Sequence, residues 1–390
     1  MQKVYGSICF EIESYYNFID KMMRKYYKLF LVYVLSYLMP LQLSAEDILR
    51  KIVCVLLFGW VAISAQAQSN ASRMDWWREA RFGMFIHLGL YSAAAGEWNE
   101  KEVEGIGEWI QNFAKVPNSE YEKLLSDFTL SKCKPETWVQ IAKQAGAKYI
   151  VFTAKHHEGF CLYPSDVTDI ENTPYKGDPL KELIEACHKY GLKVGIYYSH
   201  RQDWREEDAA VMKNEYDGHY GKDKAEVKPD LNRYIQSKAL PQVRELLTNY
   251  GKIDLLWYDT PFDLSKEQSQ LFVDVVRELQ PDCLINGRVG YNLGDYGALG
   301  DNEMPCAYAS TDLEMVATLN HTWGYKKNDH AWKGKKEILC SLIEAVNRNI
   351  NYMINIGPRA DGVVPQPSVD VLSFVGNWLR ANSEAIYGAT

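Results

Sequence analysis

The sequence predicts an α/β fold of the (β/α)-barrel type, a TIM-like barrel whose strand number need not be a regular eight. From about residue 80 onward, short β-branched or aromatic runs alternate with helical patterns, which is typical of parallel strands joined by crossover helices. Each run also turns polar at its end. A chain of 390 residues can hold one such barrel of about 250 residues or more. A doubly wound sheet shares these features and is the alternative.

The predicted strands are mostly apolar segments that end in polar residues. They are residues 82–92, 148–157, 193–199, 253–260, 283–288 and 352–358. Strands that are apolar on both faces are expected when helices cover a parallel sheet.

Three crossover helices are predicted from capping signals and from apolar residues at helical spacing. The first has Asp178 as its N-cap, Pro179 at its first position and Gly191 as its stop,. The second begins after Ser265, where Ser-Lys-Glu-Gln forms a capping-box pattern,. The third spans about 335–349.

Polar side chains gather where the predicted strands end. In a barrel, the carboxyl ends of all strands meet on one face, where the loops build the active site. We therefore expect these residues to lie close together: His87, His156, His157, Tyr197, Ser199, Asp259 and Arg288.

Charge and motif content exclude several functions. The formal net charge is −8, so a nucleic-acid partner is not expected. Neither a G-x-G-x-x-G segment after the first strand nor a G-x-x-x-x-G-K-[ST] segment is present, which disfavours nucleotide cofactors.

The adjacent residues His156 and His157 could indicate a metal site, but their context favours another role. Neighbouring strand residues point to opposite faces, and the first strand offers one histidine, His87, rather than a His-x-His pair,. We predict no metal. These histidines are interpreted as neutral hydrogen-bonding groups for ligand hydroxyls, although one of them could be a core residue.

The N-terminal part, residues 1–67, is predicted to be a signal peptide with an upstream extension. Arg50 and Lys51 precede an apolar run at 52–64, and Ala65-Gln66-Ala67 follows, the arrangement that signal peptidase recognises. We expect cleavage near Ala67, a catalytic domain at 68–390, export to the periplasm or the extracellular space, and no stable membrane span after cleavage. A second apolar stretch, at 29–39, leaves two alternatives open. Translation could start at Met39, or residues 22–39 could form a membrane anchor.

Several motifs, in the expected order, resemble those of the α-L-fucosidases of glycoside hydrolase family 29. They are WWREARFGMFIHLGLYS, AKYIVFTAKHHEGFCLYPS, GIYYSHRQDW, LLWYDT, INGRVG and NYMINIGPRADG. The resemblance implies a barrel hydrolase that removes terminal α-L-fucosyl groups from glycans or glycosides with retention, without a cofactor. It also implies that Asp259 is the nucleophile.

The same resemblance assigns a substrate pocket. By matching motifs, the residues that it implies are His87, Glu108, Trp109, His156, His157, Tyr197, Trp257 and Arg288. Trp257 also follows from strand geometry, because residues two apart on a strand point the same way, so Trp257 should share a face with Asp259 and Tyr258 should not.

The acid/base residue is harder to assign. Retaining glycosidases need a second carboxyl group about 5–5.5 Å from the nucleophile. The segment GDYGALGDNEMP places Glu303 roughly where the family has its catalytic glutamate. Glu314 is the alternative, in a stretch that usually reads Trp-Glu in the family and has Leu313 here.

Two other functions remain open at this stage. The chain could be a non-catalytic barrel that binds fucose or other glycans, or a retaining hydrolase for a related sugar such as galactose. Family members commonly continue into a β-sandwich, whereas this sequence stops at Thr390, so the usual C-terminal sandwich is expected to be absent. The sequence does not indicate an oligomeric state.

Overall fold

The computed structural model describes residues 73–132, 134–167, 173–209, 216–217, 222–223 and 229–387. The predicted signal peptide, its cleavage near Ala67 and the apolar stretch within 22–39 lie outside the described residues. The fold below is that of the unit that begins at Ala71.

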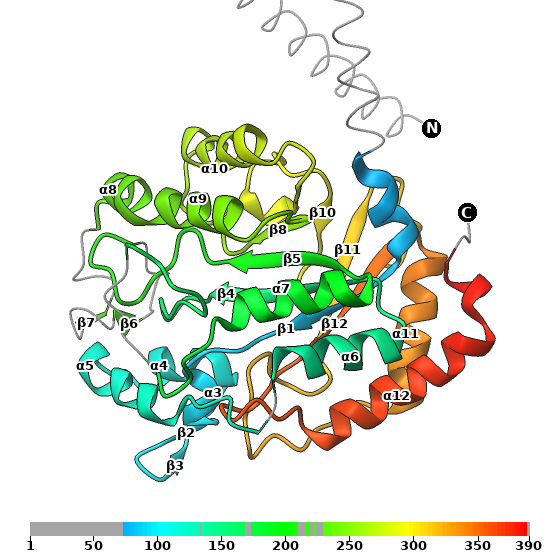
Figure 1. Cartoon of the computed structure of the whole chain (residues 1–390), viewed down its shortest axis with the longest axis horizontal. Helices are drawn as coiled ribbons and strands as arrows, with labels where there is room; N and C mark the ends of the chain where they lie inside the picture. The colour runs from blue at the N-terminus through cyan, green and yellow to red at the C-terminus, as the bar shows by residue number, and fades with distance from the viewer. Residues whose placement is uncertain are drawn as a thin grey trace, which may run out of the picture. The chain divides into compact units, whose positions relative to one another are not determined.

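The centre of the fold is an eight-stranded, all-parallel sheet in the described part of the chain (Figure 1), with strand order β10-β11-β12-β1-β4-β5-β8-β9. A parallel bridge between Asn286 and Tyr296 joins the two edges, so the sheet curls into a TIM-like barrel. The strands are β1 (Phe82–Ile86), β4 (Tyr149–Lys155), β5 (Lys193–Tyr198), β8 (Leu255–Tyr258), β9 (Leu284–Ile285), β10 (Gly297–Ala298), β11 (Leu313–Ala317) and β12 (Ile350–Ile356).

All six predicted strands are confirmed. Five are shorter than the apolar segments suggested, and β12 has the predicted length but begins two residues earlier. The sequence missed β10 and β11. β10 has two residues, too few for a periodic pattern, and β11 begins with a leucine and a glutamate, which does not read as a buried strand.

Helices cover the outside of most of the barrel (Figure 1). They are α6 (Pro135–Ala145), α7 (Pro179–Tyr190), α8 (Leu231–Tyr234), the π-helical turn Ile235–Ala239, α9 (Leu240–Asn249), α10 (Lys266–Leu279), α11 (Lys335–Asn347) and α12 (Gln366–Ala381). A further helix, residues 73–80, precedes β1. Between β9 and β11 the only helical element of the described chain is the 3₁₀ turn Gly287–Val289, so this part of the barrel is irregular. No helix in the described ranges is both long and apolar enough to cross a membrane.

Shorter elements build the loops around the barrel. They are α3 (Tyr91–Ala94), β2 (Glu97–Trp98), β3 (Lys101–Glu102), η1 (Gly107–Trp109), α4 (Ile110–Phe113), α5 (Asn118–Tyr121), η2 (Glu122–Asp127), β6 (Tyr216–Asp217), β7 (Lys222–Asp223) and η6 (Ser383–Ala385). Of these, η1 contributes directly to the candidate site.

The three predicted helices are confirmed, and so are the capping signals of two. The Asp178 side chain accepts a hydrogen bond from the Lys181 backbone at the start of α7, and Gly191 ends that helix in the left-handed conformation. Ser265 forms the predicted capping box with Gln268 at α10. These local interactions satisfy backbone groups that a helix end leaves unpaired.

Two apolar layers hold the fold together. The larger lies between the strands and the outer helices. The smaller fills the barrel interior and includes Phe85, Tyr197 and Trp257 from three strands, together with Trp77 from the helix at 73–80. Trp77 stacks on Tyr296 with ring centroids 4.4 Å apart, so this helix closes the amino-terminal end of the barrel.

Candidate active site

A cavity of about 550 Å³ opens at the carboxyl ends of the strands. Nine of the predicted site residues line it: His87, Glu108, Trp109, His156, His157, Tyr197, Trp257, Asp259 and Arg288. Glu303 and Glu314 are not among the lining residues. The strand ends therefore converge as expected for a barrel, and the two glutamates proposed as acid/base lie apart from that convergence.

Asp259 directly follows β8 and is held on several sides. Tyr197 donates a hydrogen bond to Oδ2 at 2.9 Å, while Arg288 and the Thr260 backbone N–H donate to Oδ1 at 3.0 and 2.9 Å. Trp257 lines the same cavity, whereas Tyr258 packs in the outer layer, which confirms the predicted alternation. The carboxylate is thus fixed in orientation at the cavity wall.

Arg288 links two carboxylates. Besides Asp259, its guanidinium contacts Asp301 at 2.6 Å and donates to the Leu299 carbonyl at 2.7 Å. Its Cζ lies 4.9 Å from the ring centroid of Trp257, within the range of a cation–π interaction. Burial disfavours its charge, but Asp259 and Asp301 outweigh that effect and raise the pKa of Arg288.

The three predicted histidines are buried in the cavity wall, and burial favours their neutral form. Burial lowers the pKa of His87 to about 4, and it lowers the pKa of His156 and of His157 well below the ordinary value, with further contributions from nearby positive charge. His156 stacks on Tyr197 with centroids 5.4 Å apart. Neutral imidazoles can both donate and accept hydrogen bonds, as the sequence interpretation required.

Glu108 reaches the cavity from η1. Its Oε2 accepts hydrogen bonds from Thr322 Oγ1 and from the Trp323 and Gly324 backbone N–H groups, at 3.1, 3.1 and 2.8 Å. Its Oε1 is buried and has no hydrogen-bond partner among the described residues. Burial raises the pKa of Glu108 to about 7, against the lowering effect of these hydrogen bonds, so the carboxyl group is partly protonated near neutral pH. The adjacent Trp109 places its ring beside His157, with centroids 5.5 Å apart.

The carboxyl groups considered for acid/base catalysis occupy different places. Glu303 is exposed, and its carboxylate folds over Gly300, because a Cβ built on that glycine would lie 2.3 Å from Glu303 Oε2. Glu314 is fully buried and accepts hydrogen bonds from Tyr149 Oη at 2.7 Å and Trp257 Nε1 at 2.9 Å. Its position suits the orientation of Trp257 more than contact with a ligand.

Sequence reasoning missed other lining residues, of which Asp301 and Trp323 bear most on chemistry. Asp301 is a third lining carboxylate, beside Asp259 and Glu108. It belongs to the same short segment as Glu303, so the acid-rich loop was the available signal. Phe85 also lines the cavity, and its spacing of two residues from His87 on β1 could have revealed it.

The cavity combines a fixed carboxylate, neutral imidazoles, a partly protonated carboxyl and aromatic faces. This combination suits an uncharged polyhydroxylated ligand, because rings pack against C–H surfaces and the polar groups pair with hydroxyls. Across the described residues, no group of three or more His, Cys, Asp or Glu is arranged to hold a metal ion.

A TIM-like barrel with such a cavity at the carboxyl ends of its strands has the architecture of a sugar-acting barrel hydrolase. The family model described as alpha-L-fucosidase matches residues 62–384, and the chain belongs to the α-L-fucosidase family of glycoside hydrolases. The tissue alpha-L-fucosidase of Homo sapiens is 30% identical over 338 residues, which cover 80% of this chain and 69% of that protein.

Solved structures agree with this assignment. Alpha-L-fucosidase AlfC from Lactobacillus casei, in complex with its α-L-fucose product, has a TM-score of 0.75 and 35% identity, covering 80% of this chain and 99% of that one. Alpha-L-fucosidase isoenzyme 1 from Paenibacillus thiaminolyticus has a TM-score of 0.74 and 38% identity, covering 82% and 78%. The predicted fold and family are therefore confirmed.

Proposed function

We propose that this enzyme hydrolyses terminal α-L-fucosyl linkages of glycans or glycosides with retention of configuration, using Asp259 as the nucleophile. The observation that carries the proposal is the position of Asp259, whose carboxylate is oriented by Tyr197 and Arg288 at the wall of a cavity suited to a sugar. The substrate class follows from the family and from the α-L-fucose named in the AlfC complex.

The proposed reaction has two displacements. Asp259 attacks the anomeric carbon, the glycosidic bond breaks, and the acid/base carboxyl gives its proton to the leaving oxygen. The same group then takes a proton from water, whose oxygen attacks the fucosyl–Asp259 ester and releases fucose and the free carboxylate. Retention results because the anomeric carbon is inverted twice.

Two carboxylates of the loop at 299–303 compete for the acid/base role. Glu303 is the residue that the sequence indicates, and its carboxylate packs on Gly300, which lines the cavity. Asp301 is favoured by its position, because it lines the cavity and shares Arg288 with Asp259. Glu314 is a weaker candidate because its buried carboxylate already accepts hydrogen bonds from Tyr149 and Trp257.

Asp259→Asn tests the nucleophile. We expect it to lower kcat for an aryl α-L-fucoside by about a thousandfold or more, since removal of a group that acts in the covalent step causes losses of that order. Asp274→Asn, an exposed change on α10, is the control and should keep full activity. Equal activity of Asp259→Asn and wild type would contradict the assignment.

Azide rescue identifies the acid/base. An aryl fucoside with a good leaving group needs little protonation, so a variant without the base accumulates the fucosyl-enzyme, and azide replaces water as the attacking group. We compare Asp301→Ala, Glu303→Ala and Glu314→Ala, and expect azide to accelerate Asp301→Ala and to yield α-fucosyl azide. If azide accelerates only Glu303→Ala, Glu303 is the acid/base instead.

The competing functions have separate outcomes. A glycan-binding barrel without catalysis would bind fucose but leave the aryl fucoside intact, and a galactosidase would turn over the galactoside faster than the fucoside. We expect the fucoside to be turned over faster than the galactoside. We also expect α-L-fucose to be the first anomer of the product seen by NMR.

We also propose that the protein is exported after cleavage near Ala67, on the basis of the apolar run and the Ala-x-Ala pattern,. N-terminal sequencing of the protein recovered outside the cytoplasm should then begin close to Gln68. Recovery of the full-length chain from the cytoplasm would contradict this proposal.

A further inference from the structure

A chain of hydrogen bonds runs behind the His157 ring. His157 Nδ1 lies 2.7 Å from Ser199 Oγ, and Ser199 Oγ donates to the Gln202 carbonyl oxygen at 2.9 Å. A serine hydroxyl has one proton, and a carbonyl oxygen can only accept. Because the Ser199 proton serves Gln202, the proton between His157 and Ser199 has to come from His157 Nδ1.

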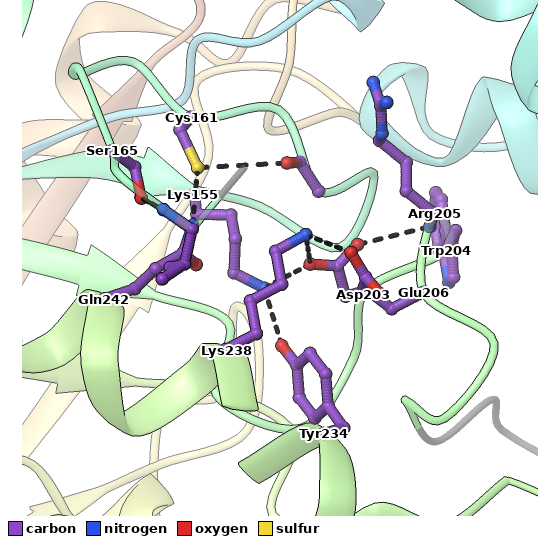
Figure 2. Close-up of polar contacts among 12 residues, drawn as sticks. Lys155, Cys161, Ser165, Asp203, Trp204, Arg205, Glu206, Tyr234, Lys238 and Gln242 are labelled. Carbon is purple, nitrogen blue, oxygen red and sulfur yellow. Dashed lines mark hydrogen bonds and ion pairs between the residues drawn. The ribbon is translucent and has the colours of Figure 1, made fainter. Parts of the chain in front are cut away.

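The segment that carries this carbonyl is anchored by a buried cluster of charges (Figure 2). The Lys155 ammonium, completely buried, donates to the Gln202 carbonyl at 3.2 Å and pairs with Asp203 at 3.3 Å. Lys238 pairs with the same Asp203 oxygen at 3.0 Å. Breaking such buried pairs is costly, so the Gln202 carbonyl is held firmly at the position where it receives the Ser199 proton.

The backbone of His157 is fixed to the same segment. The Trp204 backbone N–H donates to the His157 carbonyl at 2.7 Å, and the Trp204 and Trp109 rings lie 5.8 and 5.5 Å from the His157 ring. These contacts restrict rotation of the imidazole. The ring nitrogen that faces Ser199 is therefore defined by the fold.

Neutral His157 with a proton on Nδ1 has a lone pair on Nε2. That nitrogen lies 3.7 Å from Asp259 Oδ2, and neither atom then has a proton to share with the other. A group that enters between them has to be a hydrogen-bond donor, and both residues line the cavity.

His87 has the same protonation pattern for a different reason. Asn355 Nδ2 donates to the Trp323 carbonyl at 2.7 Å, which leaves Asn355 Oδ1 facing His87 Nδ1 at 2.8 Å. An amide oxygen only accepts, so His87 Nδ1 carries the proton and Nε2 carries the lone pair. Two cavity histidines thus share one tautomer, each through its own partner.

We propose that Ser199 and Asn355 are positioning residues that hold His157 and His87 as Nδ1–H tautomers, so that both Nε2 atoms accept hydrogen bonds from sugar hydroxyls. The tautomers follow from the geometry alone, whereas the identity of the donors rests on the proposed function. The pair of acceptors makes the site specific for ligand groups that can donate, which a C–F or C–H replacement of a hydroxyl cannot do.

The test is a two-bond ¹H–¹⁵N correlation spectrum of the protein labelled with ¹⁵N-histidine, which distinguishes Nδ1–H from Nε2–H imidazoles. The spectra of His157→Gln and His87→Gln assign the two residues by their missing signals. In wild type we expect both histidines as Nδ1–H. Ser199→Ala should convert His157 to Nε2–H or to a mixture without changing His87, and Ser199→Thr, which keeps the hydroxyl, should restore the wild-type pattern.

Ser269→Ala is the matched control, because Ser269 is equally buried and does not line the cavity. It should leave both histidine signals unchanged. His157 as Nε2–H in wild type, or an unchanged His157 signal in Ser199→Ala, would overturn the proposal.

Addition of L-fucose completes the test. We expect the Nε2 resonances of His87 and His157 to shift as their lone pairs accept hydrogen bonds, with both protons remaining on Nδ1. Conversion of either histidine to Nε2–H, or no shift at saturating fucose, would overturn the acceptor role. Turnover of the aryl fucoside is measured separately, so a failure of the proposed activity is distinguishable from a failure of the tautomer assignment.

Discussion

At the residue scale, Glu108 is a carboxyl group of the cavity wall whose protonation changes near neutral pH. Its Oε2 is occupied by three donors, while Oε1 has no partner in the described ranges and its pKa is raised to about 7 by burial. A carboxyl that is protonated near neutral pH can donate to a ligand oxygen, which the histidine acceptors cannot do. The cavity thus offers both kinds of polar group within one wall.

Glu108→Gln should make stability less sensitive to pH. The folded pKa of about 7 exceeds the ordinary 4.5, so the stabilising contribution of Glu108 is fully present below pH 4.5 and is lost as pH rises through 7. That loss is on the order of 3 kcal/mol for a shift of this size. Gln keeps the accepting oxygen and stays neutral, so the difference in unfolding free energy between pH 4.5 and 8, measured with urea, should shrink by about that amount.

Glu158→Gln is the comparison for this measurement. Burial raises the pKa of Glu158 to about 7 as well, but both of its oxygens accept hydrogen bonds, from the Leu90 and Tyr91 backbones and from Tyr121. The glutamine amide cannot replace both acceptors, so Glu158→Gln should lose stability at every pH. An undiminished pH dependence in Glu108→Gln would show that Glu108 is not the titrating group.

The sequence predicts most of the polar residues of the cavity because these residues follow two simple rules. Asp259 and His87 stand where apolar strands turn polar, and Trp257 follows from the two-residue period of a strand. Asp301 obeys neither rule. It lies in a loop with Glu303 two residues away, and only the fold shows which of the two carboxylates faces the cavity.

At the element scale, the sequence predicts helices well when their caps involve neighbouring residues. It does not predict strands whose burial depends on residues far away in the chain. The Ser265 capping box involves residues three apart. In β11, by contrast, the buried Glu314 is satisfied by Tyr149 and Trp257 from two other strands, which a local pattern cannot reveal. A glutamate in a short strand therefore reads as surface although it is completely buried.

Ser265→Ala tests the local contribution to α10. The serine hydroxyl oxygen accepts from the Gln268 backbone N–H at 3.2 Å, and the Ser265 backbone N–H donates to Gln268 Oε1 at 2.8 Å. Loss of the cap should lower the unfolding free energy by about 1 kcal/mol, as measured by urea denaturation. Ser341→Ala on α11, where the serine bonds the Glu337 carbonyl within an exposed helix face, should cost clearly less. The reverse order would mean that the capping box does not stabilise α10.

At the scale of the whole molecule, the barrel depends on one bridge between nearby residues, which joins its edges, and on contacts between residues far apart in the chain. The single bridge Asn286–Tyr296 joins the sheet edges, and the helix at 73–80 covers the opposite end from the cavity. The Trp77 carbonyl accepts from Asn351 Nδ2 at 2.7 Å, and Arg78 pairs with Asp312 at 2.8 Å. The motif that contains Trp77 helped to indicate the family. Only the assembled barrel shows that the helix at 73–80 closes the amino-terminal end, and we call this helix the plug.

Trp77→Ala should therefore destabilise the whole barrel while leaving the chemistry of the site intact. Trp77 is 1% exposed and stacks on Tyr296 at the joined edges, so its truncation leaves a cavity that should cost about 3–5 kcal/mol, measured as the urea unfolding free energy. Trp76→Ala is the matched control, because Trp76 is only half-buried and, within the described part of the chain, its ring meets Tyr149 at 6.1 Å and Lys193 Nζ at 5.3 Å. The KM of the folded Trp77→Ala enzyme should equal that of wild type, since the plug and the cavity lie at opposite ends of the strands. If Trp77→Ala lowers the unfolding free energy no more than Trp76→Ala does, the amino-terminal end does not stabilise the barrel. If the folded Trp77→Ala enzyme has a raised KM, that end is not independent of the site.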